Sequence, residues 1–158
     1  MDVSYVNPFI MSTIETLQKM LNVESHAGTL AIKNNALHTF DVTGVIGLSG
    51  EAAGSICLSF PQDVALRTVS ALLGMEVTDM GDEVTDGIGE LVNIVAGNAK
   101  QYLTAQKYNL SISLPKVVIG RSHSVASMSG VPTFVVPILS KLGEFAMEIS
   151  LKTPEAKK

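Results

Sequence analysis

The stretch from residue 86 to 104 constrains the fold of this chain most, because it has the pattern of one long amphipathic helix. At about 100° per residue, its apolar residues gather on one side: Ile88, Leu91, Val92, Val95, Ala99, Tyr102 and Leu103. The opposite side, within roughly 40° of one line, carries Asp86, Glu90, Asn93, Gly97, Lys100 and Thr104. Such a helix buries its apolar side and presents the other to solvent or to a partner.

The exposed side of this helix is poorly suited to stabilise a helix in water. It has no ladder of Glu–Lys pairs spaced four residues apart. Glycines at positions 87, 89 and 97 each cost about 1 kcal/mol of helix stability relative to alanine. A Glu and an Asn three residues apart, here Glu90 and Asn93, more often belong to a solvated surface. The glycines, however, favour a surface that something contacts closely.

The length and composition of the chain indicate one globular domain. A domain of 158 residues can bury a substantial core, and 46% of the residues are hydrophobic whereas 16% are charged. We expect the domain to span residues 1–152. Residues 153–158 are expected to form a flexible C-terminal tail.

Charge and hydropathy argue against several classes of function. The formal net charge is −4 and the 11 Lys and Arg residues are scattered, which disfavours nucleic-acid binding. No apolar run approaches the ~20 residues of a membrane-spanning helix, and the N-terminus lacks the basic segment of a secretory signal. The single cysteine, Cys57, has no internal disulfide partner and fits a small core residue in a strand. These features predict a cytoplasmic protein.

The N-terminal half has the pattern of one helix followed by strands. A helix is expected over 7–21, with Asn7 as the N-cap and Pro8 at the first helical position. A short helix is expected over 62–73, with Gly74 ending it. Between these helices, the pattern predicts three strands, over 29–33, 41–49 and 55–60.

The C-terminal half repeats this order. Asp82 or Thr85 is expected to cap the long helix. Prolines at 115, 132 and 137 favour bulges or edge positions in the strands that follow, because proline cannot donate a ladder hydrogen bond. These strands are expected over 110–120, 131–139 and 145–152. Two helix–three-strand halves predict an α+β fold in which two long helices pack side by side on a mainly antiparallel sheet.

Common catalytic and metal-binding motifs are missing from the sequence. His26, His38 and His123 are far apart and lack the spacing of metal ligands, so surface or turn roles are favoured. The same isolation argues against a Ser-His-Asp triad, and neither a dinucleotide fingerprint nor a P-loop is present. No metal site and no bound nucleotide are therefore predicted, and the pair Glu90 and Asn93 remains the candidate site.

The segment Asp86-x-x-x-Glu90-x-x-Asn93, continuing as Ile-Val-Ala-Gly-Asn-Ala, resembles the signature helix of the CheC/CheX/FliY phosphatase family, and of its CheX branch in particular. Residues 54–61 resemble the family's strand-to-helix turn, and residues 135–137 with 143–151 resemble its closing hairpin. The resemblance covers essentially the whole chain and implies the CheC-like fold.

What the resemblance implies is hydrolysis of the aspartyl phosphate on a receiver-domain response regulator, such as phosphorylated CheY. Asn93 would enter the receiver's active site and orient the attacking water, and Glu90 would pair with the receiver's active-site lysine. Asp86 would support docking, Gly97 would let the receiver approach closely, and Lys100 lies on the same partner-binding side. The chain would need no cofactor of its own, because the receiver supplies Mg²⁺.

The first predicted helix carries an incomplete second copy of the motif. Glu15 and Gln18 have the spacing of Glu90 and Asn93, but Met11 stands where the family has Asp or Ser. We therefore expect one active site. The resemblance also implies a homodimer formed by strand pairing. Two alternatives stay open: a non-catalytic adaptor that binds a receiver or a flagellar-switch component, and a structural dimerisation domain without a receiver partner.

Overall fold

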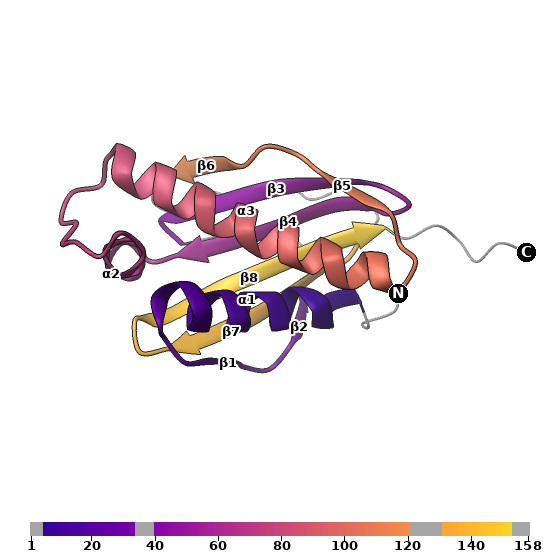
Figure 1. The fold of residues 1–158 in the computed structure, drawn as a ribbon, viewed down its shortest axis with the longest axis horizontal. Helices are drawn as coiled ribbons and strands as arrows, with labels where there is room; N and C mark the ends of the chain where they lie inside the picture. Colours follow the sequence, from indigo (N-terminus) through magenta and orange to yellow (C-terminus); the bar gives the residue numbers. More distant parts are fainter. Residues whose placement is uncertain (1–4, 34–39, 121–130, 153–158) are drawn as a thin grey trace, which may run out of the picture.

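The computed structural model describes residues 5–33, 40–120 and 131–152, which form a layer of helices on one face of a sheet (Figure 1). Within these ranges there are three helices and eight strands, and the strands form a single sheet. This architecture confirms the predicted α+β fold. The expected tail at 153–158, together with His38 and His123, lies outside the described residues.

Every strand pair in the described part of the sheet is antiparallel. The strand order is β1-β7-β8-β4-β3-β5, with β2 also paired to β7 and β6 also paired to β3. The strands are β1 (Ser25–Ala27), β2 (Ala31–Lys33), β3 (Val42–Gly50), β4 (Ala53–Phe60), β5 (Leu110–Ile112), β6 (Lys116–Ile119), β7 (Thr133–Ser140) and β8 (Gly143–Lys152). Two hairpins, β3–β4 and β7–β8, therefore form the centre, and short strands form both edges.

The two halves of the chain exchange their edge strands. β1 and β2 belong to the N-terminal half but pair with β7, whereas β5 and β6 belong to the C-terminal half but pair with β3. Each half is thus a helix, an interrupted edge strand and a hairpin, which confirms the predicted repeat. The other strand bounds agree within two residues, and the larger differences are two: β1 falls outside the strand expected over 29–33, and the strand expected over 110–120 is divided into β5 and β6.

Prolines lie at the interruptions of both edge strands. Pro115 separates β5 from β6. Pro137 lies in β7 opposite the gap between β1 and β2, where the Gly28 N–H donates a 2.7 Å hydrogen bond to the Pro137 carbonyl. The N–H that proline lacks would point to the same side as that carbonyl, so the pairing with β8 is undisturbed. Pro115 therefore lies at a sheet edge, as predicted, whereas Pro137 lies in β7, which has paired strands on both sides.

Helix α1 (Val6–Leu21) begins earlier than the sequence predicts. Tyr5 occupies the N-cap position and no side chain caps the helix, so the prediction of Asn7 as cap and Pro8 as first helical residue is wrong. Pro8 still lies in the first turn, where a backbone N–H has no partner within the helix. The helix ends at Asn22, which adopts a left-handed conformation and closes the last turn through its N–H.

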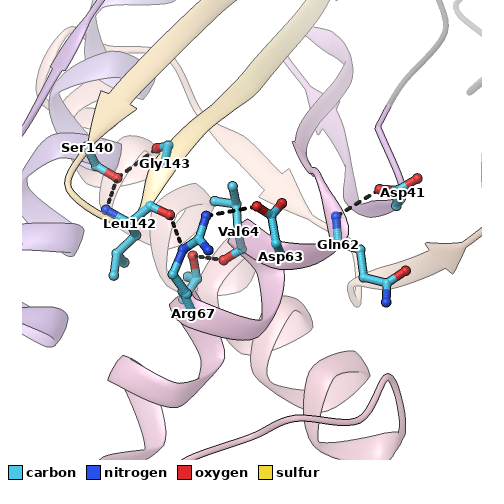
Figure 2. Close-up of polar contacts among 9 residues, drawn as sticks. Asp41, Gln62, Asp63, Val64, Arg67, Ser140, Leu142 and Gly143 are labelled. Atoms are coloured by element: carbon cyan, nitrogen blue, oxygen red, sulfur yellow. Dashed lines mark hydrogen bonds and ion pairs between the residues drawn. The ribbon is translucent and has the colours of Figure 1, made fainter.

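Helix α2 (Gln62–Leu73) has the predicted bounds, and Gly74 ends it in a left-handed conformation as expected. Its first backbone N–H donates to the carboxylate of Asp41, which precedes β3, at 2.8 Å (Figure 2). On the other side of the helix, the Arg67 guanidinium donates to the Leu142 carbonyl in the β7–β8 turn at 2.8 Å. These two bonds hold α2 against both central hairpins.

Helix α3 (Asp82–Ala105) contains the long amphipathic stretch that the sequence predicts. Gly81 occupies the N-cap position and no side chain caps the helix, so the expected cap by Asp82 or Thr85 is wrong. Asp82 and Glu83 instead place negative charge in the first turn, where it interacts favourably with the helix dipole. Neither α3 nor any other helix of the described residues is apolar over a length sufficient to cross a membrane.

The core lies between the helices and the sheet. Ile88 and Val92 of α3 press against Gly44 of β3, where a Cβ atom would lie 3.1 Å from a methyl carbon of each. Phe60 and Phe145 stack on the same side of the sheet, with ring centroids 4.5 Å apart. The predicted apolar side of α3 is buried at six of its seven positions: Ile88, Leu91, Val92, Val95, Ala99 and Leu103.

Helices α1 and α3 lie side by side across the sheet, as predicted (Figure 1). The Ser12 hydroxyl on α1 donates to the Val95 carbonyl on α3 at 2.6 Å. One turn further along, the Asn98 side chain donates to the Thr16 hydroxyl oxygen at 3.4 Å. The two helices therefore form one layer, and their outer sides form one surface.

Candidate functional site

The candidate site lies on the side of α3 that faces away from the sheet. Asp86 and Glu90 are exposed, whereas Asn93, Gly97 and Lys100 are half-buried. The positions between them that face the sheet are buried, so the helix has the two-sided character that the sequence predicts. The structure thus brings all five predicted residues together on one side of one helix.

Three polar side chains on this side of α3 form no hydrogen bond or ion pair with other described residues. Within the described ranges, no hydrogen bond or ion pair engages the side chains of Asp86, Glu90 or Asn93. A carboxylate without a cationic partner and an amide without a donor or acceptor partner remain available to another molecule.

The glycines of α3 do not share one role. A Cβ atom at Gly97 would have no neighbour within 4 Å, so this position is a bare patch beside Asn93. A Cβ atom at Gly87 would lie 2.9 Å from two methyl carbons of Val69 on α2. Gly87 is therefore explained by packing within the chain, and the inference that all of the α3 glycines point to an external contact is wrong for this position.

The pair Glu90 and Asn93 can bind and orient but cannot attack. An amide donates and accepts hydrogen bonds, so Asn93 can hold a water molecule in a chosen direction. The carboxylate of Glu90 can accept hydrogen bonds from a cation such as a lysine ammonium. One turn of helix separates the two residues, so a partner that bound Glu90 would also meet Asn93.

The corresponding side chains on α1 are engaged within the protein. The Tyr102 hydroxyl lies 2.7 Å from each carboxylate oxygen of Glu15 and donates to them. Gln18 is exposed, and its amide lies 3.5 Å from the Asn22 side-chain oxygen. Met11 is 48% exposed. The copy of the motif on α1 is thus on the surface, but its carboxylate already has a partner.

Tyr102 is the residue that sequence reasoning placed incorrectly. It falls on the apolar side of the predicted helix, yet the structure leaves it half-buried and bonded to Glu15. The hydrogen bond to Glu15, burial and the negative charge of Glu15 together raise the pKa of the Tyr102 hydroxyl above its ordinary value. A tyrosine on an apolar stripe needs a partner for its hydroxyl, which is the signal in the sequence that points to this contact.

The remaining candidates from the sequence do not join the site. His26 lies exposed in β1. Cys57 is buried in β4, on the strand that also contributes Phe60 to the core. In the part of the chain that the structure describes, no three His, Cys, Asp or Glu side chains are grouped closely enough to hold a metal ion.

The family model described as chemotaxis phosphatase CheX matches residues 42–139, a range that contains all of α3 and the candidate site. Among curated proteins, the CheY-P phosphatase CheX of Thermotoga maritima is 30% identical over 154 residues. That alignment covers 97% of this chain and 99% of the relative.

Solved structures share the fold over nearly the whole chain. A CheC-like superfamily protein from Shewanella sp. PV-4 is 33% identical, with a TM-score of 0.88 over 96% of this chain and 99% of the other. CheX of Borrelia burgdorferi, solved in a complex with CheY, BeF₃ and Mg²⁺, is 26% identical, with a TM-score of 0.81 over 96% and 99% of the two chains.

Together, the antiparallel sheet, the paired helices and the polar side of α3 define a CheC-like α+β protein. Within that class, this chain belongs to the CheX family of CheY-P phosphatases, which are protein aspartyl-phosphate hydrolases.

Proposed function

We propose that this chain accelerates hydrolysis of the aspartyl phosphate on a CheY-like receiver domain, using the outer side of α3 as its active surface. The observation that carries this proposal is the pair Glu90 and Asn93. The two side chains lie one helical turn apart, and neither has a hydrogen-bond or ion-pair partner among the described residues. The match to the CheX family model over this helix supports it.

The reaction requires little from the phosphatase beyond positioning. Water attacks the phosphorus in line with the bond to the receiver's aspartate. A new P–O bond forms, the bond to the aspartate breaks, and inorganic phosphate departs with the protons of the water. The leaving group is a carboxylate, which is stable without a proton. The receiver supplies Mg²⁺ to neutralise charge on the phosphoryl oxygens. Asn93 provides the direction of attack by holding the water, which is an effect of orientation.

The other residues of the site prepare this geometry. The Glu90 carboxylate accepts a hydrogen bond from the lysine ammonium of the receiver and so fixes the receiver relative to Asn93. The bare surface at Gly97 lets the receiver backbone come close to the helix. Asp86 and Lys100, at the two ends of the polar side, carry opposite charges and set the orientation of docking.

A phosphate-release assay tests the proposal. The wild-type chain should speed phosphate loss from a phosphorylated receiver, and Asn93→Ala should remove about 100-fold or more of that acceleration. Asn98→Ala is the matched control, because Asn98 lies on the same helix but its side chain faces Thr16 of α1. Equal rates for Asn93→Ala and wild type would rule out the proposed role. Binding of the receiver without any change in phosphate lifetime would support a non-catalytic adaptor instead.

The proposal includes a homodimer formed through a sheet edge. Both edges carry exposed apolar side chains, at Ile32 in β2 and at Val118 and Ile119 in β6. An open edge with apolar side chains favours pairing with a second strand. Light scattering should give twice the mass of one chain, and Ile32→Lys and Val118→Lys, measured separately, should show which edge is responsible. A monomer in the wild type would exclude the dimer.

A further inference from the structure

The two halves of the chain place a carboxylate and an amide at matching points of their helices. Glu15 and Gln18 are the tenth and thirteenth residues of α1, and Glu90 and Asn93 are the ninth and twelfth residues of α3. The two helices occupy equivalent places in the exchanged halves of the fold. Glu15 and Gln18 also line a hollow of the surface, together with Lys19 and Glu24. The chain therefore contains a second surface built like the candidate site.

The two helices differ in where they end. α1 ends at Leu21, three residues after Gln18, because Asn22 turns left-handed. α3 ends at Ala105, twelve residues after Asn93. Its additional turns remain helical because Ala99 and Leu103 continue the buried stripe.

The additional turns of α3 carry Tyr102, the residue that forms a hydrogen bond with Glu15. The Tyr102 hydroxyl lies 2.7 Å from both oxygens of the Glu15 carboxylate. The shorter α1 has no residue that reaches Glu90 in the same way, and Glu90 makes no side-chain bond within the described ranges. The difference in helix length thus separates a bonded carboxylate from an available one.

We propose that the outer side of α1 is a second receiver-docking surface that Tyr102 holds closed, so that each chain acts on one receiver at a time. This inference rests on the proposed function of α3. A receiver lysine would have to displace the Tyr102 hydroxyl from Glu15 before it docked. Gln18 adds a second obstacle, because its side chain is one methylene longer than that of Asn93 and would place the amide beyond the position of the water.

The proposal is tested by opening the α1 surface in a chain whose α3 site is disabled. In the Asn93→Ala background, we would combine Tyr102→Phe, which frees Glu15, with Gln18→Asn, which shortens the amide. This triple variant should dephosphorylate the receiver about tenfold faster or more than Asn93→Ala alone, because a correctly placed hydrogen-bonding group contributes orders of magnitude. Adding Glu15→Ala should abolish the regained activity.

The matched control replaces Tyr102→Phe with Tyr108→Phe. The Tyr108 hydroxyl also forms a hydrogen bond across the helical layer, to the hydroxyl of Tyr5 at the start of α1 at 2.9 Å, and no hydrogen bond joins it to Glu15. A variant with Asn93→Ala, Gln18→Asn and Tyr108→Phe should therefore remain as slow as Asn93→Ala. If both tyrosine variants regained activity equally, the effect would come from looser helices, and the proposal would be wrong.

Receiver stoichiometry gives a second readout that does not depend on chemistry. Titration calorimetry with a receiver loaded with beryllofluoride and Mg²⁺ should give one receiver per wild-type chain and two per chain carrying Gln18→Asn and Tyr102→Phe. This inference would be overturned if the folded triple variant stayed inactive and the variant with Gln18→Asn and Tyr102→Phe still bound only one receiver. That result would leave the proposed role of the α3 site intact. A wild-type chain that neither binds nor dephosphorylates a receiver would instead overturn both proposals.

Discussion

Helices α1 and α3 occupy equivalent places in the fold, yet their buried sides differ in polarity. The inner side of α1 carries three fully buried hydroxyls, at Ser12, Thr13 and Thr16. Ser12 donates to an α3 carbonyl, and Thr13 donates within α1 and contacts the Met147 sulfur at 3.4 Å. At the matching positions, α3 buries Gly87, Ile88 and Leu91. At these three positions the buried side of α1 is polar, whereas that of α3 is apolar.

This difference extends to the outer sides of the two helices. On α1 the carboxylate of Glu15 is bonded to Tyr102, and on α3 the carboxylate of Glu90 has no partner among the described residues. The comparison indicates that a repeated fold can keep one copy of a site and assign the other copy to holding the helices together.

The largest expected effect comes from exchanging the amides of the two helices. Asn93→Gln gives α3 the amide of α1 and should lower the dephosphorylation rate about 100-fold, because a displacement of about 1 Å can cost that much. Gln18→Asn in the otherwise wild-type chain should leave the rate unchanged, because Tyr102 still holds Glu15. Both rates come from phosphate release under single-turnover conditions.

A different outcome would change the comparison itself. If Asn93→Gln retained the wild-type rate, the position of the amide would not matter and the oriented-water mechanism would fail. If Gln18→Asn alone raised the rate, then Tyr102 would not close the α1 surface.

The carboxylates should differ by a smaller factor. Glu90→Gln removes the charge that pairs with the receiver's lysine and should weaken receiver binding about tenfold, which is about 1.4 kcal/mol. Glu15→Gln should leave receiver affinity unchanged, because Glu15 is bonded to Tyr102 in the wild type. Calorimetric titration with a beryllofluoride-loaded receiver measures both affinities. A loss of affinity in Glu15→Gln equal to that in Glu90→Gln would place the receiver on both helices.

Two of the three glycines of α3, Gly87 and Gly97, should respond to alanine with opposite signs. Gly97→Ala adds a methyl group in open space and should raise the free energy of unfolding by about 0.5–1 kcal/mol. Gly87→Ala adds a methyl group 2.9 Å from Val69 and should lower the free energy of unfolding by about 1 kcal/mol or more. Urea denaturation measures the free energy of unfolding of both variants. If Gly87→Ala were more stable than the wild type, α2 would have moved to accommodate the added methyl group at little cost.

The sequence predicted those features whose signals are local. The bounds of α2 follow from Pro61 and Gly74, and the polar and apolar sides of α3 follow from residue spacing. The same periodicity placed Asp86, Glu90, Asn93, Gly97 and Lys100 on one side, and the structure agrees. A local pattern is sufficient for these features because each depends on neighbours within one or two turns.

Features that depend on distant residues could not be predicted. β1 has three residues, Ser-His-Ala, and pairs with β7 without a pattern of its own. The caps expected at Asn7 and at Asp82 or Thr85 are wrong, because packing and the preceding chain decide where a helix begins. The partner of Gly87 lies on another helix. The bond between Glu15 and Tyr102 joins residues 87 positions apart.

The smallest expected effect is a change in the titration of Tyr102. Its pKa lies above the ordinary value of 10.0 because the hydroxyl donates to Glu15, is partly desolvated and faces a negative charge. The folded-state pKa is raised, so this contact stabilises the fold below the ordinary pKa and loses its effect as pH rises through the raised pKa. Glu15→Gln should move the pKa of Tyr102 back toward 10.0.

The matched variant on α3 makes this titration a direct comparison of the two helices. Glu90→Gln should leave the pKa of Tyr102 unchanged, because no bond joins Glu90 to it. The pKa is followed by carbon NMR of the tyrosine rings at alkaline pH, with Tyr102→Phe identifying the signal. If Glu15→Gln and Glu90→Gln shifted that signal equally, the pKa of Tyr102 would depend on the total charge of the helical layer. The hydrogen bond to Glu15 would then not be what distinguishes the outer side of α1 from that of α3.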